Sequence, residues 1–215
     1  MRETGIYNLL NIFLRVILYS FMVAGVYAAI RFDAVHPMED GYFGEISMTE
    51  ILQELILLFL FLFYLLSGFK NRDIQPVTNL VSLFFLISFI REFNFIIEWW
   101  LYPVLLVLLI MAWFFYRDFN KMNSASVAFF SKPASAWLLA GFTITYVFSR
   151  LFGQSSFWLI LYDDSNYRLA KAAVEEGLEL LGNTVMLISA IEFSLQQISG
   201  SSKGITPGPP AAGKG

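Results

Sequence analysis

The residues of this sequence that could do chemistry are charged side chains inside otherwise apolar runs. The run FFLISFIREFNFIIEWW, residues 84–100, carries the adjacent Arg91 and Glu92 among side chains that would suit a lipid bilayer. A charge at the bilayer centre costs at least about 2.5–3.5 kcal/mol, so such residues normally face a bundle interior or a cavity and pair there. Further charges in apolar runs are Glu54, Arg150, Glu176 and Glu179.

Helical spacing predicts that these charges meet in one layer. Glu176, Glu179 and Asn183 follow the i, i+3, i+7 pattern and share a helix face, whereas Glu175 is offset by about 100° and is left out. Each arginine can bridge two carboxylates. The carboxylates outnumber the arginines, and this excess would be met by a proton, a cation or water. The predicted outer-layer cluster consists of Glu54, Arg91, Glu92, Arg150, Glu176, Glu179 and Asn183.

Glu50 and His36 have local interpretations that keep them out of this cluster. The sequence Ser47-Met48-Thr49-Glu50 has the pattern of a capping box, in which Ser47 and Glu50 satisfy free amides at a helix start. His36 is the one histidine of the chain. A lone histidine in a predicted loop favours a surface role, because a metal site recruits several ligands.

A second pair of charges, Arg15 and Glu192, is predicted at the other side of the membrane. Arg15 stands about eight residues into the first apolar run and Glu192 about six residues from the end of the last, so their depths agree within about one helical turn. We expect an ion pair that joins the first and last helices. The alternative is that residues 4–15 lie along the interface and Arg15 extends toward water.

The elements that must position these residues are transmembrane helices. The 215 residues are 57% apolar and 14% charged, well below the charged content of about 25% in soluble domains. The apolar runs are continuous rather than alternating, which favours helices over barrel strands. The sequence predicts an all-α bundle of six spans in one domain, residues 1–198, with spans near 7–31, 48–69, 76–94, 98–116, 134–152 and 172–198.

The connecting segments differ in character. A tight turn is expected within residues 94–98, and residues 32–47 form an acidic loop. Residues 153–167 contain an apolar patch too short to span, which would be interfacial or re-entrant, or would pack against the helix tops. The tail 199–215 is rich in Gly, Pro and Ser and is predicted to be disordered.

The distribution of basic residues predicts the direction of the chain. Cytoplasmic loops retain Lys and Arg. The termini and the segments after the second and fourth runs carry most of them, whereas the opposite side has Arg31, Arg168 and Lys171. Both termini are therefore predicted to be cytoplasmic, with the cluster near the outer face. A bacterial inner membrane is favoured because the chain is compact and carries no organelle signal.

Several kinds of chemistry are excluded by residue types. The chain has no cysteine and one histidine, so Cys-ligated sites, H-E-x-x-H zinc sites, bis-His haem and Glu-x-x-His di-iron sites are absent. The net charge of −3 argues against a nucleic-acid partner. We expect no metal and no cofactor, and no motif identifies catalytic residues.

Several functions stay open. We favour a structural or accessory protein whose charges hold helix ends together, with the bilayer and another membrane-protein subunit as partners. The alternatives are a proton- or cation-coupled transporter or channel, an intramembrane enzyme acting on a lipid-linked substrate, and a sensor of outer pH or ligand. The sequence does not identify a substrate or an oligomeric state.

Overall fold

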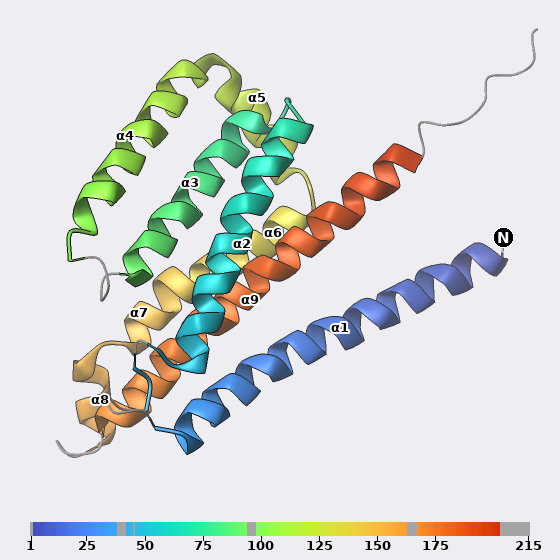
Figure 1. Ribbon diagram of the computed structural model, residues 1–215. Coiled ribbons are helices and arrows are strands. Elements are labelled where there is room, and N and C mark those ends of the chain that lie inside the picture. The colour runs from blue at the N-terminus through green and yellow to red at the C-terminus, as the bar shows by residue number, and fades with distance from the viewer. Residues whose placement is uncertain (1, 38–41, 45, 94–97, 163–166, 203–215) are drawn as a thin grey trace, which may run out of the picture.

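The computed structural model describes residues 2–37, 42–44, 46–93, 98–162 and 167–202. Within these ranges the regular structure is helical, without strands (Figure 1). The elements are α1 (Arg2–Val35), α2 (Met48–Lys70), α3 (Gln75–Glu92), α4 (Leu101–Arg117), α5 (Phe119–Phe130), α6 (Ala134–Thr143), the π-helical turn η2 (Ile144–Phe148), α7 (Ser149–Phe152), α8 (Ser155–Leu161) and α9 (Tyr167–Ser202).

Within the described residues, 4 helical segments are long and apolar enough to cross a membrane by themselves. They are Leu9–Val35, Met48–Lys70, Ala134–Phe152 and Tyr167–Gln197. The predicted span near 98–116 corresponds to α4. This helix is long and apolar enough to cross a membrane only when it is taken together with α5, and the chain bends by 94° between the two helices. The predicted span near 76–94 is the helix α3, which is outside this set because its 18 residues include the strongly polar Gln75, Asn79, Arg91 and Glu92. The length and apolarity of the 4 segments are those expected of a membrane protein.

Helix α9 is the centre of the bundle. It contacts α1, α2, α6, η2, α7 and α8, whereas α3 and α4 reach the bundle mainly through α2 and each other. Figure 1 shows α1 on one side of α9 and the α3–α4 pair on the other. The N-terminal end of α1 and the C-terminal end of α9 lie at the same end of the molecule.

The hydrophobic core toward that end is aromatic. Tyr64 of α2, Phe85 of α3, Phe129 of α5 and Phe193 of α9 are all fully buried. The ring centroids of Tyr64 and Phe85 are 5.8 Å apart and those of Phe129 and Phe193 are 5.7 Å apart, the range in which aromatic pairs attract. This packing explains α5, a helix that was not predicted: its Phe129 enters the core although the segment is too polar to span.

Helices α6 and α9 cross backbone to backbone at two glycines. A Cβ on Gly182 would lie 2.7 Å from the Thr145 nitrogen and 2.8 Å from the Gly141 oxygen, which no real Cβ tolerates. Small residues permit such close approach between membrane helices. Directly after this crossing, η2 interrupts the α-helical repeat. The crossing and the π-helical turn together fix how α7 faces α9.

The connecting segments were predicted with mixed success. The apolar patch within 153–167 is the short helix α8, whose buried Trp158 donates its indole N–H to the Phe152 carbonyl, as expected for packing against the helix ends. Helix α1 runs into the predicted acidic loop as far as Val35, and α9 continues through Ser202 into the predicted tail. Most of the turn predicted within 94–98, and residues 203–215 of the tail, lie outside the described residues.

Candidate polar site between α2, α3, α7 and α9

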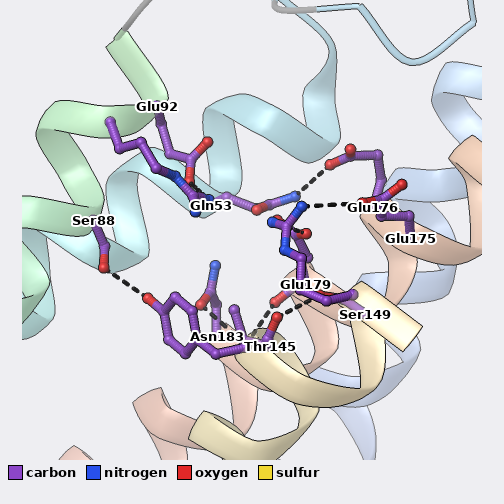
Figure 2. A network of polar contacts seen from close by, with 12 residues as sticks. Gln53, Ser88, Glu92, Thr145, Ser149, Glu175, Glu176, Glu179 and Asn183 are labelled. Carbon is purple, nitrogen blue, oxygen red and sulfur yellow. Dashed lines mark hydrogen bonds and ion pairs between the residues drawn. The ribbon is translucent and has the colours of Figure 1, made fainter. Parts of the chain in front are cut away.

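The best-connected charge of the site is Arg150 of α7. Its Nη1 lies 3.0 Å from Glu175 Oε1 and its Nη2 donates to Glu179 Oε1 (Figure 2). Lys171 Nζ also approaches Glu175, at 3.7 Å. The Glu179 side chain is only 6% exposed, whereas that of Arg150 is 47% exposed. A buried carboxylate on α9 is thus held by an arginine that reaches in from the surface of another helix.

Glu175 was left out of the predicted cluster and belongs in it. The 100° offset between Glu175 and Glu176 is present, and Figure 2 shows the two side chains diverging from α9. The long Arg150 side chain contacts Glu175 and Glu179 at once, because its guanidinium offers several donors. Helix-face counting alone therefore underestimates what an arginine on a neighbouring helix can reach.

Helix α2 contributes Gln53 to the site. Gln53 is 1% exposed, and its Nε2 donates to Glu176 Oε2 at 3.0 Å. Sequence reasoning missed this residue because an uncharged amide in a span is usually an ordinary interhelical hydrogen-bond donor. Glu54, the next residue and a predicted member, is only half-buried. It interacts electrostatically with Glu92 and forms no hydrogen bond or ion pair within the described residues.

The capping-box prediction for Glu50 was half right. Ser47 Oγ accepts from the Glu50 amide at 3.3 Å, as the pattern predicts. The Ser47 amide, however, donates to the Gly44 carbonyl at 2.9 Å, and the Glu50 carboxyl hydrogen-bonds to Glu176 across the helix pair. The exclusion of Glu50 from the cluster was therefore wrong geometrically, because a sequence pattern does not distinguish a side chain that reaches back from one that reaches across.

The carboxylate that caps α2 is Asp33, from the last turn of α1. Its two oxygens accept from the amides of Met48 and Thr49, each at 2.8 Å, and it is 3% exposed. An acidic side chain at a helix N-terminus satisfies free amides and opposes the positive end of the helix dipole. Asp33 therefore joins the end of α1 to the start of α2 beside the site.

Helix α3 contributes the adjacent charges Arg91 and Glu92. Arg91 Nη2 lies 2.8 Å from Glu92 Oε1, so these neighbours pair with each other. Arg91 also interacts electrostatically with Glu179, and Glu92 with Glu54 and Glu50. The contact of α3 with α9 at this level is electrostatic, and no ion pair joins them within the described residues.

Hydroxyl groups of the η2 region form the inner boundary of the site. Thr145 Oγ1 lies 3.3 Å from the Glu179 carbonyl oxygen and 3.4 Å from Asn183 Oδ1, and Ser149 donates to the Thr145 carbonyl. Tyr146 and Ser88 share a hydrogen bond of 2.8 Å between their hydroxyl oxygens, which joins η2 to α3. Asn183, predicted from its spacing, is 1% exposed at this boundary.

A polar hollow of about 420 Å³ opens beside the carboxylates. Its lining combines cationic and acidic side chains: Ser155, Tyr167, Arg168, Lys171, Ala172, Glu175 and Glu176. The described residues contain no group of three or more His, Cys, Asp or Glu side chains arranged to hold a metal ion. The chemistry available here is ion pairing and the sharing of protons between carboxyl groups.

The second predicted pair, Arg15 and Glu192, lies near the opposite end of the bundle. Arg15 Nη1 is 3.0 Å from Glu192 Oε1 and 2.8 Å from Oε2, and the Tyr19 hydroxyl also donates to Oε1. Glu192 is 7% exposed. This pair borders a largely apolar groove of about 820 Å³ between α1, α6 and α9. Arg15 and Tyr19 thus connect α1 to α9 at the border of this groove.

Comparison with protein-family models, curated proteins and solved structures finds no match to this chain. In its described residues the chain is a helical bundle with 4 segments apolar enough to cross a membrane and a polar cluster at one end.

Proposed function

We propose that the chain crosses the bilayer six times with both termini in the cytoplasm, and that it is a structural or accessory membrane protein. In this proposal the polar cluster lies near the outer face and holds helix ends together. The observation that carries it is that Arg150 and Gln53 connect α7 and α2 to carboxylates of the same helix, α9. The cluster then gives the bundle a fixed geometry that a partner subunit can recognise.

Glu179 is buried, so its carboxylate depends on its ion-pair partner. Removing one partner of a buried ion pair costs about 3–5 kcal/mol, because the remaining charge is left uncompensated. Arg150 is half-exposed, so water would screen part of that loss, and we expect about 2 kcal/mol for Arg150→Gln. Arg31→Gln is the matched control, since Arg31 is exposed on α1 and forms no ion pair within the described residues.

The test compares the thermal stability of Arg150→Gln and Arg31→Gln in detergent. The proposal predicts a lower Tm for Arg150→Gln and an unchanged Tm for Arg31→Gln. Equal stability of both variants and the parent protein would contradict a structural role for the cluster.

A proton-coupled transporter or channel is the second candidate, and one contact favours it. Glu50 and Glu176 are hydrogen-bonded to each other, and a hydrogen bond between two carboxyl groups needs one proton between them. Glu176 also lines the polar hollow, which offers that proton a route to water. Proton-coupled function predicts that Glu176→Gln keeps its stability and abolishes a pH-driven flux in proteoliposomes. Glu54→Gln, at a carboxylate outside the hydrogen-bond network, is the control.

The direction of the chain is tested by labelling single cysteines, because the parent sequence has none. His36→Cys and Lys121→Cys replace exposed residues at the two ends of the bundle. We expect His36→Cys to react with an impermeant maleimide on intact cells and Lys121→Cys only after permeabilisation. The reverse pattern would place the polar cluster on the cytoplasmic side.

A further inference from the structure

A second polar hollow lies at the end of the bundle far from the carboxylate cluster. Its volume is about 370 Å³. It is formed where α2 ends, where α5 turns into α6 and where the last turns of α9 pass, and its lining residues are Lys70, Asn71, Lys132, Gln196 and Gln197. Elements that are distant in the sequence therefore meet here. The charged side chains that they contribute are both lysines, which donate hydrogen bonds and cannot accept them.

The electrostatics of this hollow favour an anion. The lining contains two ammonium groups and three amides and no carboxylate. Neither Lys70 nor Lys132 has an ion-pair partner within the described residues. Lys132 Nζ lies 4.2 Å from the centroid of the Phe193 ring, and burial lowers the pKa of this lysine. A lysine held over an aromatic ring and partly removed from water is stabilised when an anion binds beside it.

An amide of the lining also lacks a partner. Gln197 Nε2 is buried and forms no hydrogen bond within the described part of the chain. Buried donors are nearly always satisfied, so an unpaired one beside two lysines points to an acceptor from outside the protein. The oxygens of an anion would accept from this amide and from both ammonium groups at once.

We propose that this hollow binds a phosphate group through Lys70, Lys132 and Gln197. Lysine is a common phosphate ligand, and basic pockets between membrane helices at the cytoplasmic side bind the headgroups of anionic lipids. The phosphate belongs either to such a lipid or to a phosphorylated solute in the water phase, and both present the same oxygens to these donors. The proposal is independent of the function assigned to the carboxylate cluster.

The experiment uses the full chain in a neutral detergent. Native mass spectrometry counts bound lipid after addition of phosphatidylglycerol or phosphatidylcholine, and thermal shift measures stabilisation by phosphatidylglycerol or inorganic phosphate. The variants are Lys132→Gln and Lys70→Gln, and the matched control is Lys121→Gln, an exposed lysine of α5 outside the hollow. We expect the parent and Lys121→Gln to retain phosphatidylglycerol and either hollow variant to bind at least tenfold more weakly.

The two sources of phosphate are distinguished by competition. Retained phosphatidylglycerol that inorganic phosphate does not displace assigns the site to a lipid, and stabilisation by inorganic phosphate alone assigns it to a solute. An equal loss in Lys121→Gln and the hollow variants would overturn the proposal, because general surface charge would then explain the binding. Absence of both ligands from the parent protein would overturn it as well. If Lys132→Gln does not fold, Gln197→Glu, which adds a repelling carboxylate, provides the same test.

Discussion

Helices α1 and α9 have nearly the same length, 34 and 36 residues, and opposite surroundings. Only 6% of the most apolar stretch of α1 is buried within the protein, against 67% for α9, although α1 is the more apolar helix. In a bilayer, lipid tails solvate apolar side chains as well as protein does, so packing and polar contacts decide which helix is central. The central helix is therefore the one that carries Glu176, Glu179, Asn183 and Glu192.

The two helices are also attached in different ways. Helix α9 meets α6 through backbone atoms at Gly141 and Gly182. Helix α1 is held mainly by side chains, through Asp33 at the start of α2 and Arg15 at Glu192. Within the described part of α1, the buried residues are Val26, Ala29 and Asp33. Substitutions in α9 should therefore disturb the bundle, and those in α1 should loosen a peripheral helix.

The largest expected effect is that of Gly182→Ala. Its new Cβ would collide with backbone atoms of Thr145 and Gly141. Overpacking typically costs about 1–3 kcal/mol, and we expect the upper end here because backbone rather than a flexible side chain must shift. Gly25→Ala in α1 is the matched control, because a Cβ there has no neighbour within 4 Å and alanine is the better helix former. Unfolding in a mixed-micelle denaturant titration measures both. Similar free energies of unfolding for the two variants would remove the contrast between α1 and α9.

A smaller effect is expected for Glu192→Gln, which breaks the attachment of α1. Arg15 and Tyr19 would both lose a charged acceptor, and Arg15 can reach water, so the loss should be about 1–2 kcal/mol. The swapped variant carrying Arg15→Glu and Glu192→Arg should recover part of the stability lost by either single change. Losses that simply add would show that the two residues do not depend on each other.

The smallest effect is expected for Phe21→Ala, on the face of α1 that points away from the other helices. Phe21 is 73% exposed within the protein, so its removal should change the free energy of unfolding by less than about 0.5 kcal/mol. Thermal unfolding in detergent, and again in lipid nanodiscs, measures the change. A marked loss of stability in both would mean that protein rather than lipid covers this face of α1, as expected for an accessory subunit seated there.

Much of the fold was predictable because apolar runs define membrane helices. The predicted spans 48–69 and 134–152 correspond closely to Met48–Lys70 and Ala134–Phe152. Helix α5 was not predictable in this way. Its sequence carries Asn120, Lys121 and Asn123, and it is held by the burial of Ala125 and Phe129, which depends on contacts with other helices.

The polar site was predictable in its depth and not in its partners. Position along a helix gives height, so the gathering of Arg150, Glu176 and Glu179 in one layer followed from the sequence. Which side chain faces α9 depends on the rotation of each helix, and one residue turns a helix by about 100°. For that reason Gln53 contacts Glu176 while its neighbour Glu54 does not.

The π-helical turn at Ile144–Phe148 makes the cluster sensitive to chain length as well as to residue identity. A π-helical turn accommodates one more residue than an α-helical turn, so it sets the rotation of everything that follows, including Arg150. The same residues wound as a regular α-helix would rotate Arg150 by about 100° away from α9, and so would the loss of one residue from the α-helical part of α6. In evolutionary terms, relatives could lose one residue within the turn and keep Arg150 on the face toward α9, whereas one codon lost from the α-helical part of α6 would dismantle the cluster with every charged residue still present.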